Sequence, residues 1–470
     1  MTEIPKKAIR VRMAPSPTGP LHIGGARTTL FNWLFARKYG GTFVLRIEDT
    51  DKERSEKKYE EELIEGLSWL GLDWDEGPYR QSERTEIYRK YLKELLDKGE
   101  AYYCYCTKEE LEAQRSAGAA QGLPPKYSGH CRSISSPPAG KKPEVIRFKV
   151  PEVKVEFKDL VRGKVSFDAS LFGDIVIAKD LESPLYNFAV VVDDALMQIS
   201  HVIRGEEHLS NTPKQILIQR SLGFTEPVYA HIPLILNPDR SKMSKRFSDT
   251  ALLQYREKGY LPEALMNFLA LLGWHPKDDR EVMSAKELVE LFEIERVQQA
   301  GAIFNEEKLS WLNREHMKTM DDAALARALA PFFEKEGLAS DGAFLARLAG
   351  ALRDRASTLR DFVEYGRLFF SLPDYDAKLL AWKDSSPEEA RGALEAVRKA
   401  LAAAPDAFDK KAFKEEIMRI AGERRGVVLW PLRVALSGQK ASPDPFDIAD
   451  VLGKEESLRR IDLAIKKSSS

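Results

Sequence analysis

Near its N-terminus the chain combines the pattern of a strand with a rigid loop and the start of a helix. Residues 9–13 (IRVRM) alternate apolar and charged side chains, as a half-buried strand does. The loop that follows, APSPTGP, holds three prolines and a glycine and cannot continue a central strand. Apolar residues at helical spacing then begin near Gly24, and the glycines at 40–41 end that pattern. TFVLRI at 42–47 has the pattern of the next strand, so the segment predicts a βαβ unit of a parallel sheet.

The carboxyl edge of that sheet is the expected ligand site, because ligands bind there in open α/β sheets. His22 and Glu48 both follow predicted strands and fall at this edge. A helix N-terminus favours phosphate, and glycine lets a ligand approach the backbone closely. Gly24 and Gly25 therefore indicate a phosphate site, although such a pair is also common in simple turns and a lone histidine is often structural. Neither a Walker A loop nor the dinucleotide fingerprint is present.

A second strand–helix–strand pattern lies further along the chain. Residues 196–204 (LMQISHVIR) predict a strand, and a helix follows with Asn211 as N-cap and Pro213 in its first turn. Residues 228–236 (VYAHIPLIL) predict another strand, which ends in the loop NPDRSKMSKR with its four basic residues. A basic loop at a carboxyl edge suits a polyphosphate leaving group, but a solvated surface turn has the same composition.

The two patterns together resemble the class I aminoacyl-tRNA synthetases, whose HIGH and KMSKS signatures hold ATP. HIGG at 22–25 resembles the first signature, with glycine in place of the final histidine, and KMSKR at 242–246 resembles the second. LRIEDTDKERS, WDEGPYRQSER and GYLPEALMNFLALLGW are similar to segments of the bacterial glutamyl-tRNA synthetase family. This similarity runs from about residue 8 to about residue 320. The remainder resembles the family in length and helical character more than in motif.

The resemblance implies a multidomain α/β protein. It implies a Rossmann-type doubly wound parallel sheet with an α+β insert, followed by an all-α anticodon-binding region. A β-barrel in that last region would instead be typical of glutaminyl-tRNA synthetase. The length of 470 residues fits several domains. The expected domains are the first catalytic half (1–85), the acceptor-stem insert (86–190), the second catalytic half (191–240), the stem-contact domain with the KMSKR loop (241–319) and the helical anticodon-binding domain (320–470).

The family joins glutamate to ATP, which implies ATP and Mg²⁺ as cofactors and L-glutamate and tRNA(Glu) as partners. Because the reaction needs no protein nucleophile, its catalysis rests on positioning and charge stabilisation. The resemblance assigns catalysis to His22, Lys242 and Lys245; ATP binding to His22, Gly24, Gly25, Lys242, Ser244 and Lys245; glutamate binding to Arg12, Ser16, Glu48, Tyr186 and Arg204; and tRNA binding to Arg353, Arg355 and Arg360.

The three cysteines lie within the predicted insert. Cys104 and Cys106 form a Cys-x-Cys pair, and Cys131 follows about two dozen residues later. This spacing suggests a structural zinc site with sulfur ligands. By resemblance, the fourth ligand is Tyr127, with His130 as a substitute. Three buried thiols in a zinc-free domain remain the alternative.

Composition leaves several other functions open. The formal net charge of −1 argues mildly against a strongly basic nucleic-acid binder but does not exclude local basic patches. No apolar run approaches the length of a membrane span, and we expect a cytoplasmic protein. The family resemblance implies a monomer. The alternatives are an enzyme that also glutamylates tRNA(Gln), an enzyme that glutamylates queuosine in tRNA, a small-molecule nucleotidyltransferase, and an inactive RNA-binding paralogue.

Overall fold

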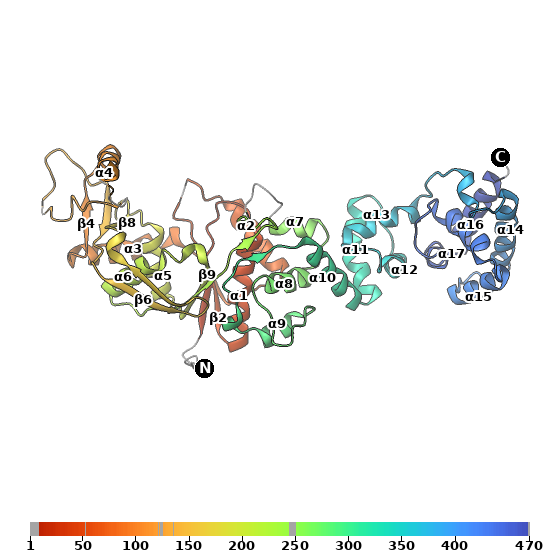
Figure 1. Cartoon of the computed structure of the whole chain (residues 1–470), viewed down its shortest axis with the longest axis horizontal. Helices are drawn as coiled ribbons and strands as arrows, with labels where there is room; N and C mark the ends of the chain where they lie inside the picture. The colour runs from red at the N-terminus through yellow and green to blue at the C-terminus, as the bar shows by residue number, and fades with distance from the viewer. Residues whose placement is uncertain are drawn as a thin grey trace. The chain divides into compact units, whose positions relative to one another are not determined.

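The computed structural model describes residues 9–51, 53–120, 122, 126–134, 136–243 and 251–468. The chain forms two compact units, which are traced by colour in Figure 1. The first unit is Met1–Tyr255 with Leu265–Glu306, and the second is Arg256–Ala264 with Glu307–Ser470. No helix among the described residues is long and apolar enough to span a membrane.

The predicted βαβ unit is present at the start of the first unit. Three parallel strands lie in the order β1-β2-β3, and the residues of β1 and β2 are almost all buried. The helix after β1 ends at Gly40, whose left-handed φ of 63° lets its N–H reach the last-turn carbonyls. The elements are β1 (Arg10–Met13), α1 (Ile23–Tyr39), β2 (Thr42–Ile47), α2 (Lys57–Trp69) and β3 (Glu76–Arg80).

The second half of the sheet is built on β9 and β10. Strand β10 pairs in parallel with β9 on one side and β6 on the other, in the order β7-β6-β10-β9. The Ser200 N–H donates to the Arg10 carbonyl at 2.9 Å, which joins β9 to the edge of β1. The elements are β6 (Lys154–Asp159), β7 (Gly163–Asp168), α5 (Tyr186–Leu196), β9 (His201–Gly205), α6 (Thr212–Leu222) and β10 (Val228–Ile232).

Two predicted strands are shorter than the sequence pattern suggested. Leu196 is the last residue of α5, and the left-handed Gln198 (φ 55°) separates that helix from β9. The run at 228–236 divides at Pro233, because proline cannot donate to a sheet ladder. Its second part is the two-residue strand β11 (Ile235–Leu236), which pairs in parallel with β12 (Ala302–Ile303).

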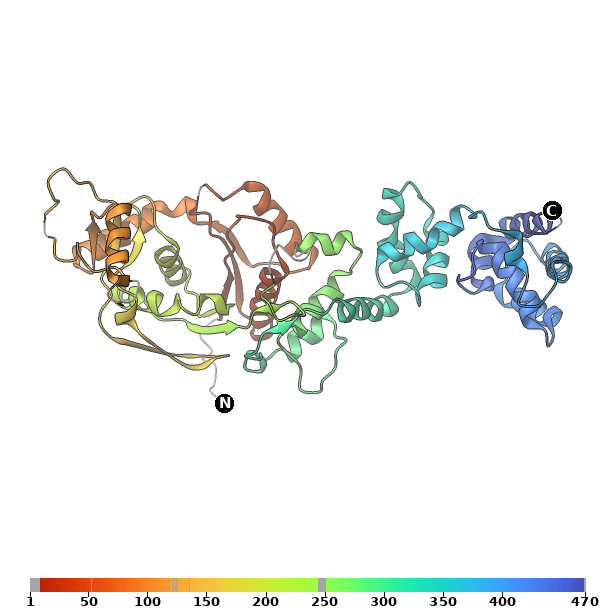
Figure 2. The ribbon, with the colours of Figure 1, turned by 45° about the horizontal axis from the view of Figure 1, so that its top comes forward.

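The insert contributes a separate antiparallel sheet in the order β4-β5-β8. Figure 2 shows this part in orange and yellow, together with the long β6–β7 hairpin that pairs with β10. The hairpin therefore belongs by sequence to the insert and by hydrogen bonding to the catalytic sheet. The insert's other elements are α3 (Thr85–Asp97), β4 (Ala101–Cys104), α4 (Lys108–Ala120), β5 (Val145–Phe148) and β8 (Ile175–Ala178).

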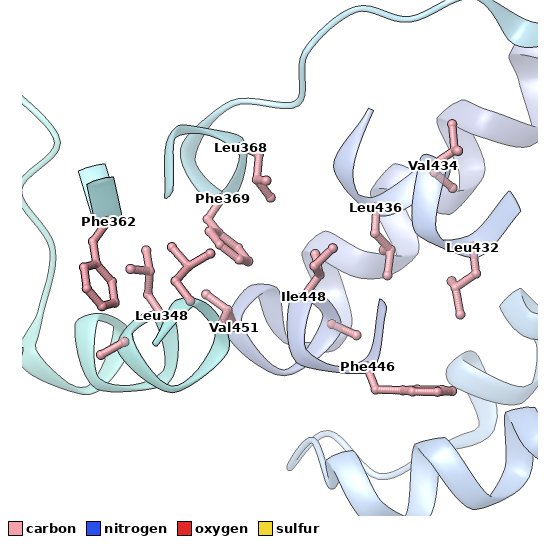
Figure 3. Close-up of a cluster of buried hydrophobic side chains, with 14 of the residues drawn as sticks. Leu348, Phe362, Leu368, Phe369, Leu432, Val434, Leu436, Phe446, Ile448 and Val451 are labelled. Atoms are coloured by element: carbon pink, nitrogen blue, oxygen red, sulfur yellow. The ribbon is translucent and has the colours of Figure 1, made fainter. Parts of the chain in front are cut away.

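The described residues of the second unit form helices and no strand. Side-chain caps begin several of them, including capping boxes at Thr358 and Ser386. Their apolar faces share one core, and Figure 3 shows Leu348, Phe369 and Ile448 within it. The second unit contains most of α10 (Glu306–Thr319) together with α11 (Asp322–Lys335), α12 (Gly342–Leu352), α13 (Leu359–Phe370), α14 (Pro387–Ala403), α15 (Lys410–Ala421), α16 (Arg425–Ser437) and α17 (Pro445–Lys467).

The predicted fold class is confirmed, with a Rossmann-type parallel sheet followed by a helical C-terminal region. Between the last strand of the parallel sheet and the helical C-terminal region, the chain also forms the short helices α7 (Leu252–Glu257), α8 (Pro262–Leu271) and α9 (Ala285–Leu291).

Candidate active site

A cleft of about 1130 Å³ opens at the carboxyl edge of the parallel sheet in the first unit. Strands β1, β2 and β9 end at its wall, as expected for ligand sites in open α/β sheets. The cleft brings together residues that lie up to 230 positions apart in the sequence. The predicted site residues that line it are Arg12, Ser16, His22, Gly24, Gly25, Glu48, Tyr186, Arg204 and Lys242.

The helix start at His22 differs from the prediction. His22 is the N-cap of α1, and its Nδ1 accepts hydrogen bonds from the N–H groups of Gly24 (3.0 Å) and Gly25 (3.3 Å). A Cβ on Gly24 would lie 2.8 Å from the His22 ring, and one on Gly25 would lie 2.7 Å from Leu21. The glycines therefore make room for the chain's own cap, and in this conformation their N–H groups serve His22 rather than a phosphate.

Two predicted glutamate-binding residues are joined by a buried ion network. Arg12 Nε lies 3.2 Å from Asp194 Oδ1, which also accepts from Arg46 at 2.7 Å. Arg46 in turn donates to Glu48 Oε1 at 3.0 Å and is fully buried. Burial raises the pKa of Glu48, and the two arginines offset only part of that rise. Burial also acts to raise the pKa of Asp194, but both arginines outweigh it and hold that pKa below its ordinary value.

The neighbouring Asp193 is held by a further set of hydrogen bonds next to this network. Its carboxylate accepts from Gln81 Nε2 at 2.9 Å, Arg84 Nε at 2.8 Å and the Tyr88 hydroxyl at 2.7 Å. Burial, followed by the Asp193 charge, raises the pKa of Tyr88 and keeps its hydroxyl a donor. Neither Asp193 nor Asp194 is among the predicted site residues. The available signal was a pair of acidic residues inside the otherwise apolar helix α5, where charges are found when they are partnered.

Arg204 and Tyr186 also line the cleft. Arg204 is 5% exposed, donates from NH2 to Thr212 Oγ1 at 2.7 Å, and leaves NH1 buried without a hydrogen-bond partner among the described residues. The Tyr186 hydroxyl lies 3.1 Å from His208 Nδ1. Burial raises the pKa of Tyr186, which keeps its hydroxyl protonated. An unpartnered guanidinium nitrogen beside a cleft suits an incoming carboxylate.

The structure describes the first residues of the basic loop. Lys242 is exposed, lines the cleft and forms an isolated bridge with Leu236. Ser244, Lys245 and Arg246 lie outside the described residues. The structure therefore places only Lys242 of the predicted pyrophosphate-binding residues.

The three cysteines of the insert meet in one buried cluster. Their sulfur atoms all lie within 4.8 Å of one another, with Cys106 and Cys131 3.5 Å apart. The Tyr127 hydroxyl is 3.5 Å from Cys104 Sγ and 3.7 Å from Cys106 Sγ, whereas His130 is exposed and is not part of the cluster. Burial raises the pKa of the Cys106 thiol to about 11, and the neighbouring sulfurs add to the rise. This donor set fits a zinc ion, whose charge stabilises the thiolates.

The three arginines predicted to bind tRNA differ in their surroundings. The Arg353 guanidinium donates to the carbonyls of Met317 and Met320 and pairs with Asp322 at 2.6 Å. Those contacts hold Arg353 at the end of α10, which makes it the weakest of the three candidates. Arg355 and Arg360 are exposed, and Arg355 makes one hydrogen bond to the Ser442 carbonyl at 3.1 Å.

The fold and the cleft define the class that the sequence led us to expect, a class I aminoacyl-tRNA synthetase. Residues 8–311 match the family described as "tRNA synthetases class I (E and Q), catalytic domain", and residues 324–465 match "Anticodon binding domain". The chain therefore belongs to the class I tRNA synthetases of the E and Q type.

Relatives narrow the comparison further. A glutamate–tRNA ligase of Thermodesulfovibrio yellowstonii is 46% identical over 470 residues, covering 98% of this chain and 100% of that protein. The glutamate–tRNA ligase of Trichlorobacter lovleyi is 44% identical, with 97% of this chain and 98% of that protein covered. The crystal structure of a glutamate tRNA ligase from Elizabethkingia meningosepticum in complex with its amino acid matches with a TM-score of 0.86 at 35% identity, covering 98% of this chain and 99% of the other.

Proposed function

We propose that this chain is a glutamate–tRNA ligase. A carboxylate oxygen of L-glutamate attacks the α-phosphorus of ATP, the bond to the β-phosphate oxygen breaks, and pyrophosphate leaves. The glutamyl group then passes to the 3′-terminal adenosine of tRNA(Glu), with release of AMP. The observation that carries this proposal is the pairing of Arg204, which has an unpartnered buried nitrogen, with the Arg12–Glu48 network in one cleft.

The cleft is complementary to an amino acid with a second carboxylate. We assign the distal carboxylate to Arg204, Arg12 and Tyr186, because two guanidinium groups and a protonated phenol all donate hydrogen bonds. We assign the ammonium group to Glu48, the acidic member of the network at the cleft wall. Ser16 is exposed at the same wall and is able to hydrogen-bond the amino acid.

ATP occupies the remainder of the cleft in this proposal. Its phosphates face the helix start at His22, where the Gly24 and Gly25 N–H groups contribute through the cap or after it opens. We assign the neutralisation of the leaving pyrophosphate to Lys242 and Lys245, and a further ATP contact to Ser244 of the same loop. Mg²⁺, when bound, neutralises phosphate charge. We expect Lys245→Ala to lower the activation rate more than the glutamate affinity; a defect in glutamate affinity alone would contradict this role.

Zinc is proposed as a structural ion of the insert, held by Cys104, Cys106, Cys131 and the Tyr127 oxygen. Its part is to fix the fold of the acceptor-stem insert, remote from the chemistry. For the anticodon we propose Arg355 and Arg360 as contacts, with Arg355 the better candidate. We also propose that the enzyme acts as a cytoplasmic monomer.

Aminoacylation of purified tRNA tests the function directly. We expect the protein to charge tRNA(Glu) with glutamate in the presence of ATP and Mg²⁺. A parallel reaction with tRNA(Gln) distinguishes an enzyme specific for tRNA(Glu) from one that charges both. Folded protein that charges neither tRNA would overturn the proposal.

A further inference from the structure

We infer that Asp159 and His231 form a positioning pair that fixes the guanidinium of Arg204 and thereby sets the recognition of the distal carboxylate. This inference rests on the proposed function, in which Arg204 binds that carboxylate. Nothing in the sequence pattern marked either residue: Asp159 lies in the insert, and His231 lies in the middle of a predicted strand.

Strand pairing brings the three residues together. His231 of β10 is in register with Arg204 of β9, and Tyr229, two residues before His231, is in register with Asp159 at the end of β6. The side chains of Asp159 and His231 are fully buried, and Arg204 is 5% exposed. The pair therefore exists because the β6–β7 hairpin of the insert adds to the catalytic sheet.

The surroundings of Asp159 define its charge. Its oxygens accept from the N–H groups of Val161 (2.9 Å), Arg162 (2.8 Å) and His231 (3.1 Å), and from His231 Nδ1 at 2.6 Å. Burial acts to raise the pKa of Asp159, but these donors, led by His231, outweigh it and hold the pKa below its ordinary value. Asp159 is thus an anion that only accepts hydrogen bonds.

The charge of Asp159 fixes the tautomer of His231. Since the carboxylate accepts, Nδ1 carries the proton, and in the neutral ring Nε2 is then an acceptor. Burial lowers the pKa of His231, so the ring stays neutral near pH 7. The acceptor Nε2 lies 3.2 Å from Arg204 Nε and 3.0 Å from Thr212 Oγ1. The imidazole therefore accepts a hydrogen bond from the Nε–H of Arg204.

Arg204 is held through two of its three guanidinium nitrogens. Nε is fixed by His231 and NH2 by Thr212 Oγ1, and the group lies 5.6 Å over the Tyr229 ring, while NH1 is buried and has no hydrogen-bond partner among the described residues. Two fixed donors leave the planar guanidinium no rotation, so NH1 is presented in one orientation. Small misplacements of a binding group reduce rates strongly, which gives Asp159 an effect on glutamate recognition without any contact to it.

Asp159→Asn is the sharpest test because it keeps the shape of the side chain. Its carbonyl can retain the backbone N–H groups, which turns the amide N–H toward His231 Nδ1. The ring proton then moves to His231 Nε2, so two N–H donors, His231 Nε2–H and Arg204 Nε–H, face each other and their hydrogen bond is lost. We expect the KM for glutamate to rise about tenfold or more in ATP–pyrophosphate exchange with tRNA(Glu), with the KM for ATP unchanged and a smaller change in kcat.

Two substitutions of His231 complete the series. His231→Leu removes the acceptor and should raise the glutamate KM at least as much, whereas His231→Gln offers an amide oxygen near the Nε2 position and should restore part of the affinity. The matched control is His201→Gln, a buried histidine on β9 that contacts Ser200 and Phe35 instead of Arg204. Thermal melting of each variant reports folding separately.

The outcomes separate this inference from the proposed function. The inference is supported if Asp159→Asn raises the glutamate KM and His201→Gln does not. It also requires that the double variant of Asp159→Asn and Arg204→Gln has no higher glutamate KM than Arg204→Gln alone. If Arg204→Gln raises the KM but Asp159→Asn and His231→Leu match the control, the positioning role is overturned and the proposed function stands. If wild-type protein shows no glutamate-dependent exchange, the proposed function itself fails. If His231→Leu does not fold, Asp159→Asn and His231→Gln decide.

Discussion

The buried arginines of the two units use their donors in different ways. In the helical unit, Arg460 donates to the carbonyls of Leu368 and Leu436 at 2.8 and 2.7 Å and to Glu456, and the partly exposed Arg353 also donates to carbonyls. In the cleft, Arg204 keeps NH1 unpartnered among the described residues. A buried arginine with all its nitrogens engaged ties helix ends together, whereas one with a spare donor beside a cleft is prepared for an anion.

Arg204→Ala should give the largest effect, and on activity rather than stability. Removal of the guanidinium leaves the substrate carboxylate buried without its partner, which costs about 3–5 kcal/mol, or roughly 150- to 5,000-fold in kcat/KM for glutamate. The measurement is steady-state ATP–pyrophosphate exchange with tRNA(Glu), alongside a thermal melt. Exchange like that of the wild type would remove Arg204 from the glutamate pocket.

Arg460→Ala should show the reverse pattern. The loss leaves carbonyls at the ends of α13 and α16 without donors, so we expect the free energy of unfolding to fall by about 2–4 kcal/mol. The glutamate KM should not change. The matched control is Arg459→Ala, because Arg459 is exposed and pairs with the same Glu456; it should cost less than about 1 kcal/mol. Equal losses for both variants in urea unfolding would contradict the assignment.

Cys131→Ser tests the zinc site of the insert. We expect the wild-type protein to hold about one zinc ion per chain and the variant well under one. Loss of a residue that only hydrogen-bonds a zinc ligand lowers metal affinity roughly 10- to 100-fold, and loss of a ligand itself should lower the affinity more. Elemental analysis after dialysis provides the measurement, with Ser128→Ala as a control in the same loop. Wild-type protein with well under one zinc per chain would exclude the metal and favour three ordinary buried thiols.

Acidification should weaken glutamate binding through Glu48. The group must be ionised to bind an ammonium ion, and burial raises its pKa, so it takes up a proton at a higher pH than an exposed glutamate does. We expect the glutamate KM to rise severalfold as the pH falls from neutrality toward the ordinary carboxyl range. In Glu48→Gln the KM should be high throughout and lose this slope. A slope that persists in the variant would assign it to another group.

Arg355→Ala should affect tRNA binding alone. Loss of an exposed arginine that contacts a nucleotide costs about 1–3 kcal/mol of binding, which should appear as a higher KM for tRNA(Glu) with the glutamate KM unchanged. Arg353→Ala is the informative comparison. It should lower the stability of the protein, and its KM for tRNA(Glu) should rise only to the extent that the protein is partly unfolded. An equal and direct effect of Arg353→Ala on tRNA binding in folded protein would restore it as a contact.

Much of the fold followed from local patterns. Alternation, the proline-rich loop and the paired glycines predicted β1, α1 and β2 with boundaries within a residue or two, because those signals act over a few residues. The end of each parallel strand then placed His22 and Glu48 in one cleft. The cysteine spacing predicted a cluster that the structure forms.

What the sequence did not predict depends on long-range pairing. Asp193 and Asp194 find their partners more than 100 positions away, and Asp159 reaches His231 only through the pairing of β6 with β10. No local pattern specifies such contacts. The contact of the His22 ring with Gly24 was not predicted either, because the glycine pattern alone does not show which group lies against it.

Glutamate-dependent ATP–pyrophosphate exchange, with and without tRNA(Glu), tests the central claim most directly. We expect exchange with tRNA(Glu) and little without it. Rapid exchange without any tRNA would instead favour the enzyme that modifies queuosine. Folded protein that gives no exchange with tRNA(Glu) or tRNA(Gln) would contradict the assignment of the cleft as a glutamate-activating site.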